Sequence, residues 1–257
     1  MDYFDKAETW DRATLETVQL ARLKTTIQQA SRAPFYAKRL AEAGVSADNL
    51  RSLEDIRRIP FTSKDDLRSQ YPYGLATVPH SEFVRMHCSS GTTGTPVAVC
   101  YTQSDINSWA DLMARCLYMA GVRKDDVFQN MSGYGLFTGG LGIHFGAERL
   151  GCMTIPAGAG NSKRQLKLVK DFGTTVAHIL PSYALHLGTT LIEEGEDPKA
   201  LSLRIACVGA EPYTEETRRR IEALFDMKVY NSYGLSEMNG PGVAFECQYQ
   251  NGLHLWE

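Results

Sequence analysis

The chain has 257 residues, of which 43% are hydrophobic, and this is enough for one large globular domain or two smaller ones. Its formal net charge is −3 with acidic and basic residues interspersed, so no basic patch indicates a nucleic-acid or membrane partner. No apolar stretch resembles a secretory signal near the N-terminus or reaches the length of a transmembrane helix.

Residues 1–80 are expected to form an N-terminal helical region. Apolar side chains recur at helical spacing from residue 14 to residue 44. Within this stretch, Pro34 is expected to open a second helix and Gly44 to end it.

Residues 81–257 are expected to form an α/β core, because strand-like and helix-like segments alternate from residue 83 onward. Such alternation is typical of layered α/β sheets with much parallel pairing. The expected strands cover residues 83–87, 97–101, 127–130, 152–156, 176–180, 204–208, 227–230, 243–247 and 253–256. The expected helices cover residues 103–120, 139–150, 161–171, 182–193 and 214–225.

The most distinctive segment is Ser89-Ser90-Gly91-Thr92-Thr93-Gly94-Thr95-Pro96. Glycines allow the backbone to turn its N–H groups inward, and together with hydroxyl groups they can form a cradle for phosphate oxygens. The segment is not a Walker A loop, because no Gly-Lys-Ser/Thr follows it. A mobile linker is the alternative. The position between two β-like segments favours a strand–loop–strand turn that binds phosphate.

Two further polar segments follow apolar strands. The first is Tyr230-Asn231-Ser232-Tyr233-Gly234-Leu235-Ser236-Glu237, where the strand is expected to end at Tyr230 and a turn to close at Gly234. An aromatic ring, hydroxyls and a carboxylate beyond the carboxyl end of a strand suit a base, a phosphate and Mg²⁺, although an ordinary surface turn is the alternative. The second is Val208-Gly209-Ala210-Glu211-Pro212, whose small residues leave room for a planar group beside the backbone, as do many ordinary β-to-α turns.

Glycines alternate with aromatic residues between Ser132 and Gly142. Glycine creates space and aromatic rings line it, which is typical of an apolar ligand pocket. A glycine-rich helix start with core aromatics is the alternative reading of the same segment.

Cysteine and histidine give weaker signals. The six cysteines are widely spaced without a C-x-x-C pair, which favours reduced thiols and a cytoplasmic setting. Cys247 and His254 are residue types that bind zinc, so either they contribute to a structural zinc site with further ligands or His254 is a plain strand residue. His87 and His144 lie near the glycine-rich segments and are candidates to face a ligand, whereas His178 is expected on the surface or in the core.

The order of these motifs carries a resemblance. SSGTTGTP, GYGLFTGGLG, GAEP, NSYGLSE and GLHLWE follow one another as they do in adenylate-forming enzymes, and the chain more narrowly resembles the phenylacetate–CoA ligase family. The likeness includes residues 53–75 and spans nearly the whole chain. Several motifs in one order are far more specific than any single motif.

The resemblance implies an acid–thiol ligase that converts an aryl acid, phenylacetate first among them, with ATP and coenzyme A into an aryl-CoA thioester, AMP and diphosphate. It also implies Mg²⁺ as a cofactor, and a homodimer. The residues implied to bind nucleotide are Ser89, Ser90, Gly91, Thr92, Thr93, Gly94, Thr95, Gly209, Ala210, Glu211, Pro212, Asn231, Ser232, Tyr233, Gly234 and Ser236. Those implied to shape the aryl pocket are Tyr134, Phe137, Gly140 and Ala210. Thr92, Thr93 and Glu237 are implied to be catalytic, with Glu237 holding Mg²⁺.

Two departures from the family pattern bear on this reading. Thr95 and Val97 flank Pro96 where the family often carries a lysine, so a direct cation to the phosphates is missing. The family's small C-terminal domain, with its hinge and catalytic lysine, is expected beyond Glu257, so we expect an inactive N-terminal portion of a ligase. The alternatives are a naturally short, non-catalytic nucleotide- or acyl-adenylate-binding module and an adenylyl transferase of the same superfamily.

Overall fold

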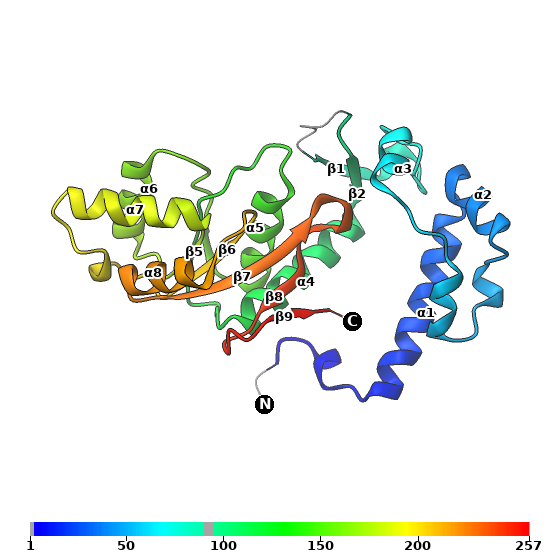
Figure 1. The fold of residues 1–257 in the computed structure, drawn as a ribbon, viewed down its shortest axis with the longest axis horizontal. Helices are drawn as coiled ribbons and strands as arrows, with labels where there is room; N and C mark the ends of the chain where they lie inside the picture. Colours follow the sequence, from blue (N-terminus) through cyan, green and yellow to red (C-terminus); the bar gives the residue numbers. More distant parts are fainter. Residues whose placement is uncertain (1–2, 90–94, 257) are drawn as a thin grey trace. The chain divides into compact units, whose positions relative to one another are not determined.

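The structure is a computed structural model that describes residues 3–89 and 95–256 (Figure 1). By their internal contacts, these residues divide into two compact units, the first ending at Ser104 and the second running from Asp105 to Trp256. The predicted domain boundary after residue 80 stays a prediction, since units defined by contacts need not be domains. Among the described residues, no helix combines the length and the apolar character needed to cross a bilayer.

The first unit begins with the expected helices α1 (Arg12–Ala30) and α2 (Pro34–Glu42). Pro34 starts α2 and Gly44, with φ +63°, follows its end, so both expected boundary signals are confirmed. A small core of Ile27, Leu40, Val45 and Leu50 holds these helices to the turns that follow. The remaining elements of this unit are η1 (Lys6–Thr9), η2 (Ala47–Asn49), η3 (Leu53–Arg58), α3 (Lys64–Ser69), η4 (His80–Glu82), β1 (Phe83–Cys88) and β2 (Ala98–Thr102).

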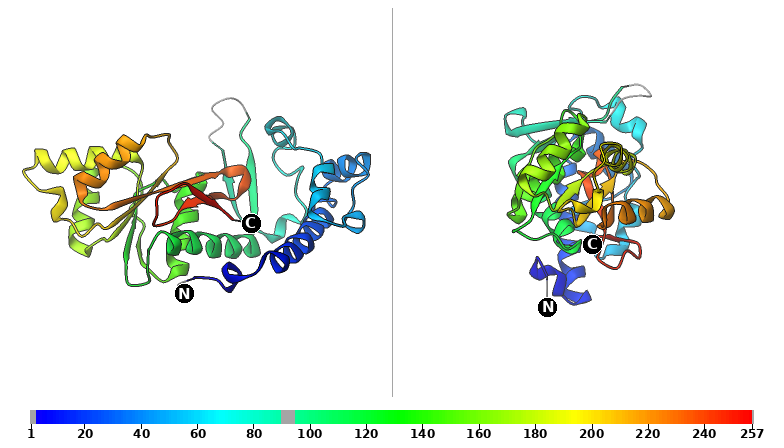
Figure 2. Two further views of the ribbon diagram at one scale, coloured as in Figure 1. Left: turned by 60° about the horizontal axis from the view of Figure 1, so that its bottom comes forward. Right: turned by 90° about the vertical axis from the view of Figure 1, so that its left-hand side faces the viewer.

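The second unit is built on one sheet. Within residues 105–256, seven strands are arranged in the order β4-β3-β5-β6-β7-β8-β9. Pairing from β4 to β7 is parallel, whereas β8 and β9 join antiparallel at one edge. The strands are β3 (Val127–Asn130), β4 (Met153–Ile155), β5 (Val176–His178), β6 (Ile205–Gly209), β7 (Lys228–Leu235), β8 (Gly240–Glu246) and β9 (Leu253–Leu255). The expected α/β fold with much parallel sheet is therefore confirmed, and Figure 2 shows it from two further directions.

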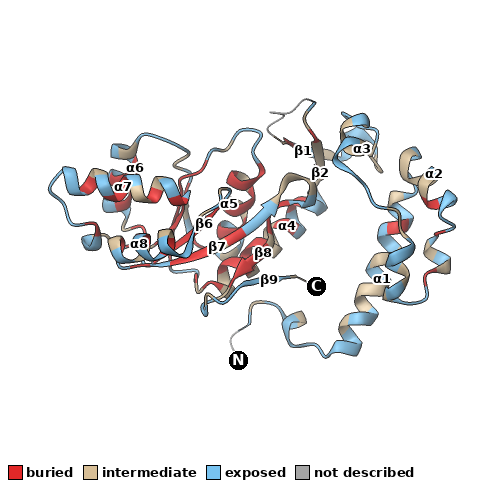
Figure 3. Cartoon of the chain, viewed as in Figure 1, coloured by how far each residue is buried: buried red, intermediate tan, exposed pale blue. Residues whose placement is uncertain are grey.

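Helices cover both faces of this sheet. They are α4 (Gln103–Met119), α5 (Thr138–Leu150), α6 (Ser162–Phe172), α7 (Pro181–Glu193) and α8 (Glu215–Phe225), with the short turns η5 (Pro198–Ala200) and η6 (Ser236–Met238). Ala206 and Val208 of β6 pack in one core with buried residues of α6, α7 and α8. Because side chains alternate along a strand, Ile205 and Cys207 point to the opposite face, and α5 contacts the sheet through β3, β4 and β8. Buried residues accordingly concentrate on the central strands and on the inner sides of the helices (Figure 3).

Strand β7 differs from expectation. The sequence predicts a strand ending at Tyr230 and a polar turn closed by Gly234, but β7 continues to Leu235. The reason is its antiparallel partner β8, which keeps the polar residues in the ladder down to the pair Leu235 and Gly240. Gly234 allows the two backbones to approach closely, because a Cβ there would lie 2.1 Å from the carbonyl oxygen of Gly240. The prediction was wrong because it was made from local polarity, without the pairing partner.

Candidate functional site

The segment expected to bind phosphate is flanked by two paired strands. β1 and β2 pair antiparallel up to Cys88 and Ala98, so the strand–loop–strand arrangement is confirmed. Ser89 closes its base twice: its backbone N–H donates to the carbonyl oxygen of Val97 at 3.0 Å, and its hydroxyl accepts from the Val97 N–H at 2.9 Å. Of the other residues predicted for this loop, Thr95 is exposed, while Ser90, Gly91, Thr92, Thr93 and Gly94 lie outside the described residues.

A cavity of about 190 Å³ lies in the second unit, where β5 and β6 end and α5 begins. In parallel sheets, ligands bind beyond the carboxyl ends of the strands, and this cavity occupies that position. Its lining residues are Phe137, Thr138, Gly139, Ile143, His178, Gly209, Ala210, Ser232, Gly234, Leu235, Ser236, Gly240 and Pro241. No acidic side chain, lysine or arginine is among them, so the cavity suits an uncharged group with both apolar and hydrogen-bonding surface.

Burial distinguishes the two ends of this cavity. Ile143, Thr138 and His178 are 0%, 3% and 6% exposed, so they form its closed end. Phe137 and Ala210 are exposed, so they lie at its mouth. A ligand must therefore enter past the β6 turn and place its deepest atoms against α5 and the end of β5.

A hydrogen-bond network fixes the closed end. Nδ1 of His178 lies 2.9 Å from Oδ1 of Asn130, the residue that ends the neighbouring strand β3. Asn130 also donates from its amide nitrogen to the carbonyl oxygen of Gly140 at 2.7 Å and accepts from the Ser132 hydroxyl at 2.8 Å. Burial lowers the pKa of His178 to about 4, so its imidazole is neutral at pH 7.

The β6 turn places small residues at the mouth. Gly209 has no room for a side chain, since a Cβ there would lie 2.5 Å from the carbonyl oxygen of Ser232. Ala210 has φ +65°, a left-handed conformation that is unfavourable for a residue with a Cβ and that often marks a functional site. Glu211 has a structural partner, because its carboxylate accepts from the Ser182 N–H at 2.6 Å and the Ser182 hydroxyl at 3.0 Å, at the start of α7. Pro212 is exposed beside it.

Some residues of β7 and of the following turn η6 line the cavity and others do not. Ser232, Gly234 and Ser236 line the cavity, whereas Asn231 and Tyr233 do not. The ring of Tyr233 is 53% exposed and is therefore free of the core packing that holds most aromatic side chains. Glu237 lies in η6 with intermediate burial.

A buried ion pair supports β7 from behind. Both terminal nitrogens of Arg218 donate to the carboxylate of Glu246, at 2.7 and 3.0 Å, and this pair is almost fully buried. Glu246 also accepts from the backbone N–H of Asn231 at 2.7 Å. The ion pair therefore anchors the backbone immediately before the cavity-lining residue Ser232.

Only part of the predicted aryl set faces the cavity. Phe137 lines it. Gly140 is buried in a different role, because a Cβ there would lie 2.2 Å from the carbonyl oxygen of Gly133. The hydroxyl of Tyr134 lies 3.1 Å from Nδ1 of His144, and burial raises the pKa of Tyr134 to about 12. Tyr134 and Gly140 thus shape the loop that precedes α5.

The part of the chain that the structure describes offers no third ligand beside the predicted zinc pair. Cys247 follows β8 with intermediate burial, and His254 is exposed in β9 opposite Phe245. No group of three or more His, Cys, Asp or Glu side chains suited to a metal occurs among residues 3–89 and 95–256. The zinc site stays a prediction that needs ligands from elsewhere.

The sequence did not indicate that His178 and Thr138, two buried polar residues, line the cavity. It placed His178 on the surface or in the core, and it did not single out Thr138 as a lining residue. His178 is the last residue of β5 and precedes the Pro181 that opens α7. The sequence signal for such a residue is a polar side chain at the end of an apolar parallel strand, because ligands bind beyond the carboxyl ends of these strands.

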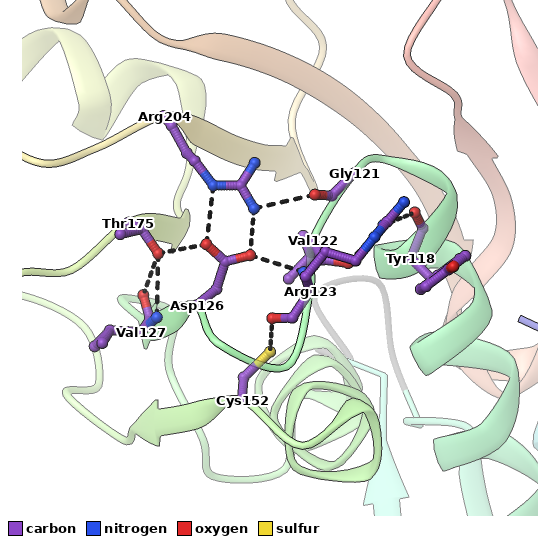
Figure 4. Close-up of polar contacts among 9 residues, drawn as sticks. All are labelled: Tyr118, Gly121, Val122, Arg123, Asp126, Val127, Cys152, Thr175 and Arg204. Atoms are coloured by element: carbon purple, nitrogen blue, oxygen red, sulfur yellow. Dashed lines mark hydrogen bonds and ion pairs between the residues drawn. The ribbon is translucent and has the colours of Figure 1, made fainter. Parts of the chain in front are cut away.

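A separate polar cluster lies at the amino ends of the parallel strands, opposite the cavity (Figure 4). Asp126, Thr175 and Arg204 directly precede β3, β5 and β6, and Asp126 accepts from the other two side chains, from Thr175 at 2.7 Å and from Nε of Arg204 at 2.9 Å. Burial alone would raise the pKa of Asp126, but these hydrogen bonds, with one from the Arg123 N–H, leave that pKa below its ordinary value. Because it lies at the amino ends of the strands, this cluster is assigned to stability.

Comparisons with known proteins agree with this architecture. Residues 13–253 match the family model described as AMP-binding enzyme. The chain is 48% identical to the phenylacetate-coenzyme A ligase of Pseudomonas putida over 98% of its own length and 58% of the relative's. It is 46% identical to the enzyme of the same name from Thermus thermophilus, over 100% of the chain and 58% of the relative.

A solved structure gives the same picture. The crystal structure of 2-hydroxyisobutyryl-CoA ligase in complex with 2-HIB-AMP and CoA matches with a TM-score of 0.90 and 30% identity, covering 99% of this chain and 58% of that one. The chain thus spans about 58% of the length of these relatives. Since the family model matches residues 13–253, nearly the whole chain, the protein belongs to the AMP-binding enzyme family.

Proposed function

We propose that this chain carries the nucleotide- and acyl-binding site of an ATP-dependent aryl-acid–CoA ligase, with phenylacetate as the leading acid. The observation that carries the proposal is the cavity at the carboxyl ends of β5 and β6, whose lining combines apolar residues with hydroxyl groups and a neutral histidine and holds no acidic side chain, lysine or arginine. The names of the two curated relatives point to the same acid.

Two displacements make up the proposed reaction. A carboxylate oxygen of the acid attacks the α-phosphorus of ATP, the bond from that phosphorus to the bridging oxygen breaks, and diphosphate leaves. The thiol sulfur of coenzyme A then attacks the carbonyl carbon of the acyl-adenylate, AMP leaves, and the thiol proton is released. Positioning of like-charged reactants is the main demand on the protein in the first step.

The nucleotide is proposed to lie across the ends of β6 and β7. The exposed ring of Tyr233 can stack on adenine, and the side-chain-free Gly209 with Ala210 lets a planar base lie close to the backbone. Ser232 and Ser236 supply hydroxyl donors for the α-phosphate and carboxylate end. The remaining proposed nucleotide contacts come from Asn231, Gly234, Glu211 and Pro212 and from the loop Ser89–Thr95.

Glu237 fits the proposed Mg²⁺ role. Mg²⁺ is usually held by one or two carboxylates together with substrate phosphates and water, so a full cage of protein ligands is unnecessary. When bound, the ion would offset the charge between the attacking carboxylate and the phosphates. Coenzyme A as the second substrate, a homodimer, a cytoplasmic location and a structural zinc at Cys247 and His254 belong to the same proposal.

The aryl ring is proposed to occupy the closed end of the cavity. A dry cavity of about 150 Å³ is known to hold benzene, so about 190 Å³ is the right size for one aromatic ring with a short side chain. Phe137 at the mouth can pack on the ring, and Tyr134 and Gly140 support the wall behind it. Ala210 lies between the proposed ring and the nucleotide.

Isothermal titration with a non-hydrolysable phenylacetyl-adenylate analogue tests this proposal. We expect the analogue to bind the 257-residue chain, and Tyr233→Ala to weaken binding by about 10-fold or more, since stacking on a base contributes about 1–3 kcal/mol. Tyr249→Ala is the matched control, because Tyr249 is 89% exposed in the turn before β9. Absence of binding to the unchanged chain, or equal weakening by both variants, would refute the proposed site.

A further inference from the structure

At the closed end of the cavity, Nε2 of His178 faces the space without a donor among the described residues. The orientation of the Asn130 amide is fixed, because its nitrogen donates to Gly140 and its oxygen accepts from both the hydroxyl and the N–H of Ser132. At 2.9 Å from that oxygen, Nδ1 of His178 must be the donor. In a neutral imidazole one nitrogen donates and the other accepts, so Nε2 of His178 carries a lone pair.

No described residue donates a hydrogen bond to Nε2. Within residues 3–89 and 95–256, the side chain of His178 has one hydrogen bond, to Asn130, and the residue is only 6% exposed. An acceptor buried without a donor costs about 1–3 kcal/mol unless a ligand or water supplies the donor. The atom is therefore arranged to be satisfied by whatever fills the cavity that His178 lines.

The surroundings define the complementary group. Ile143, Pro241 and Leu235 supply apolar surface, and the lining holds no charged side chain that could bind an anion or cation. A carboxylate at this end would face the lone pair of Nε2, so the acid group must point away from it, toward the mouth marked by the exposed residues Phe137 and Ala210. The ligand group that fits the closed end is therefore a neutral hydrogen-bond donor on an aromatic ring.

We infer that the acid accepted here is a hydroxylated arylacetic acid whose ring hydroxyl donates to Nε2 of His178 at the closed end of the cavity. This inference rests on the proposed function and specifies its substrate. The hydroxyl class is favoured over a bicyclic ring with an N–H, because a volume of about 190 Å³ exceeds the roughly 150 Å³ that holds benzene by little more than a substituent. Thr138, whose side chain also lines this end, is placed to accept or donate a second contact.

The test compares acyl-adenylate analogues on the unchanged chain. The panel contains the phenylacetyl analogue, the three ring-hydroxylated isomers, the fluorinated counterpart of the tightest isomer, and the indolylacetyl analogue. We expect one hydroxylated isomer to bind about 10-fold or more tightly than both the phenylacetyl and the fluorinated analogue, since fluorine matches the size but cannot donate.

Two variants then assign the preference to His178. His178→Asn keeps a donor for Asn130 but has no atom at the position of Nε2, so the ratio of hydroxylated to phenylacetyl affinity is expected to fall to about 2-fold or less, whatever the variant does to the affinity for both analogues. His178→Gln places an amide near Nε2 and is expected to restore part of the preference. If His178→Asn does not fold, the comparison of hydroxyl with fluorine on the unchanged chain still decides the question.

Each outcome separates this inference from the proposed function. Binding of all analogues with equal affinity overturns the inference and leaves the proposed function in place. A preference for the indolylacetyl analogue overturns the hydroxylated class. Binding of none of the analogues overturns the proposed function itself.

Discussion

His178 and Asn130 end two neighbouring parallel strands and are joined across them by a hydrogen bond of 2.9 Å. Through its amide nitrogen Asn130 also holds the carbonyl oxygen of Gly140 in α5, so three elements converge on one side chain at the closed end of the cavity. This hydrogen bond orients the imidazole through Nδ1 without any charged partner. The closed end of the cavity consequently presents a fixed polar side chain beside apolar ones.

The burial of His178 predicts acid sensitivity of the fold. Its pKa is lowered to about 4 from an ordinary value of 6.5 because the charged imidazole would be desolvated. Between these two values the unfolded chain binds a proton that the folded chain does not, so stability falls as the pH is lowered from 6.5 toward 4. The loss from this one group is on the order of 3 kcal/mol. Urea unfolding at a series of pH values measures it.

His178→Asn provides the control for that measurement. The variant cannot take up the proton, so its stability should fall less steeply between pH 6.5 and 4. His186→Asn, which alters an exposed residue of α7, should retain the slope of the unchanged chain. Parallel pH profiles for His178→Asn and the unchanged chain would contradict the assignment.

Breaking the ion pair behind β7 should destabilise the second unit strongly. Arg218 and Glu246 are 6% and 4% exposed in their side chains, so Arg218→Ala leaves a buried carboxylate without its partner. Such a loss costs about 3–5 kcal/mol. Because Glu246 also holds the N–H of Asn231, weaker binding of the phenylacetyl-adenylate analogue should accompany the lower urea midpoint.

An exposed ion pair gives the contrast. Lys38 and Glu42 in α2 are 3.9 Å apart, with side chains 78% and 64% exposed. Lys38→Ala should change stability by less than about 0.5 kcal/mol and leave analogue binding unchanged. Similar losses for Lys38→Ala and Arg218→Ala would show that burial of the inner pair does not matter.

Much of the fold could be predicted from periodicity alone. Short strands such as 127–130 and 205–209 are largely buried and separated by helices, and this alternation can be recognised in the sequence. The course of β7 could not be predicted, because the pairing of residues 231–235 with β8 is decided by contacts distant along the chain. The same limit applies to Glu211, whose carboxylate caps α7, about 30 residues earlier in the sequence. For His178, the position at the end of a strand could be inferred from the sequence, but its hydrogen bond to Asn130 depends on the neighbouring strand and could not.

Removing Asp126 should lower stability without altering ligand binding. Its carboxylate accepts from Thr175, Arg204 and the N–H of Arg123 at the amino ends of the strands (Figure 4). Asp126→Ala removes the acceptor that these donors share, although Arg204 keeps the carbonyl oxygen of Gly121, and should cost about 2–3 kcal/mol. The affinity for the phenylacetyl-adenylate analogue, titrated where the variant is folded, should stay within about 2-fold of the unchanged chain. A large loss of affinity would mean that the amino edge of the sheet also contributes to the site.

Gly209→Ala tests whether close approach of β6 and β7 is needed at the cavity mouth. A methyl group at Gly209 would lie 2.5 Å from the carbonyl oxygen and 3.0 Å from the hydroxyl of Ser232, so the strand ends must move apart. Overpacking of this kind costs about 1–3 kcal/mol, and it should also displace the hydroxyl of Ser232 from the ligand. Gly133→Ala is the matched control, because a Cβ at Gly133 meets nothing within 4 Å. Thermal unfolding and titration of both variants should show a lower midpoint and weaker analogue binding for Gly209→Ala alone. Equal behaviour of the two variants would indicate that the mouth of the cavity tolerates separation of these strands, and that the close contact between Gly209 and Ser232 does not shape the ligand site.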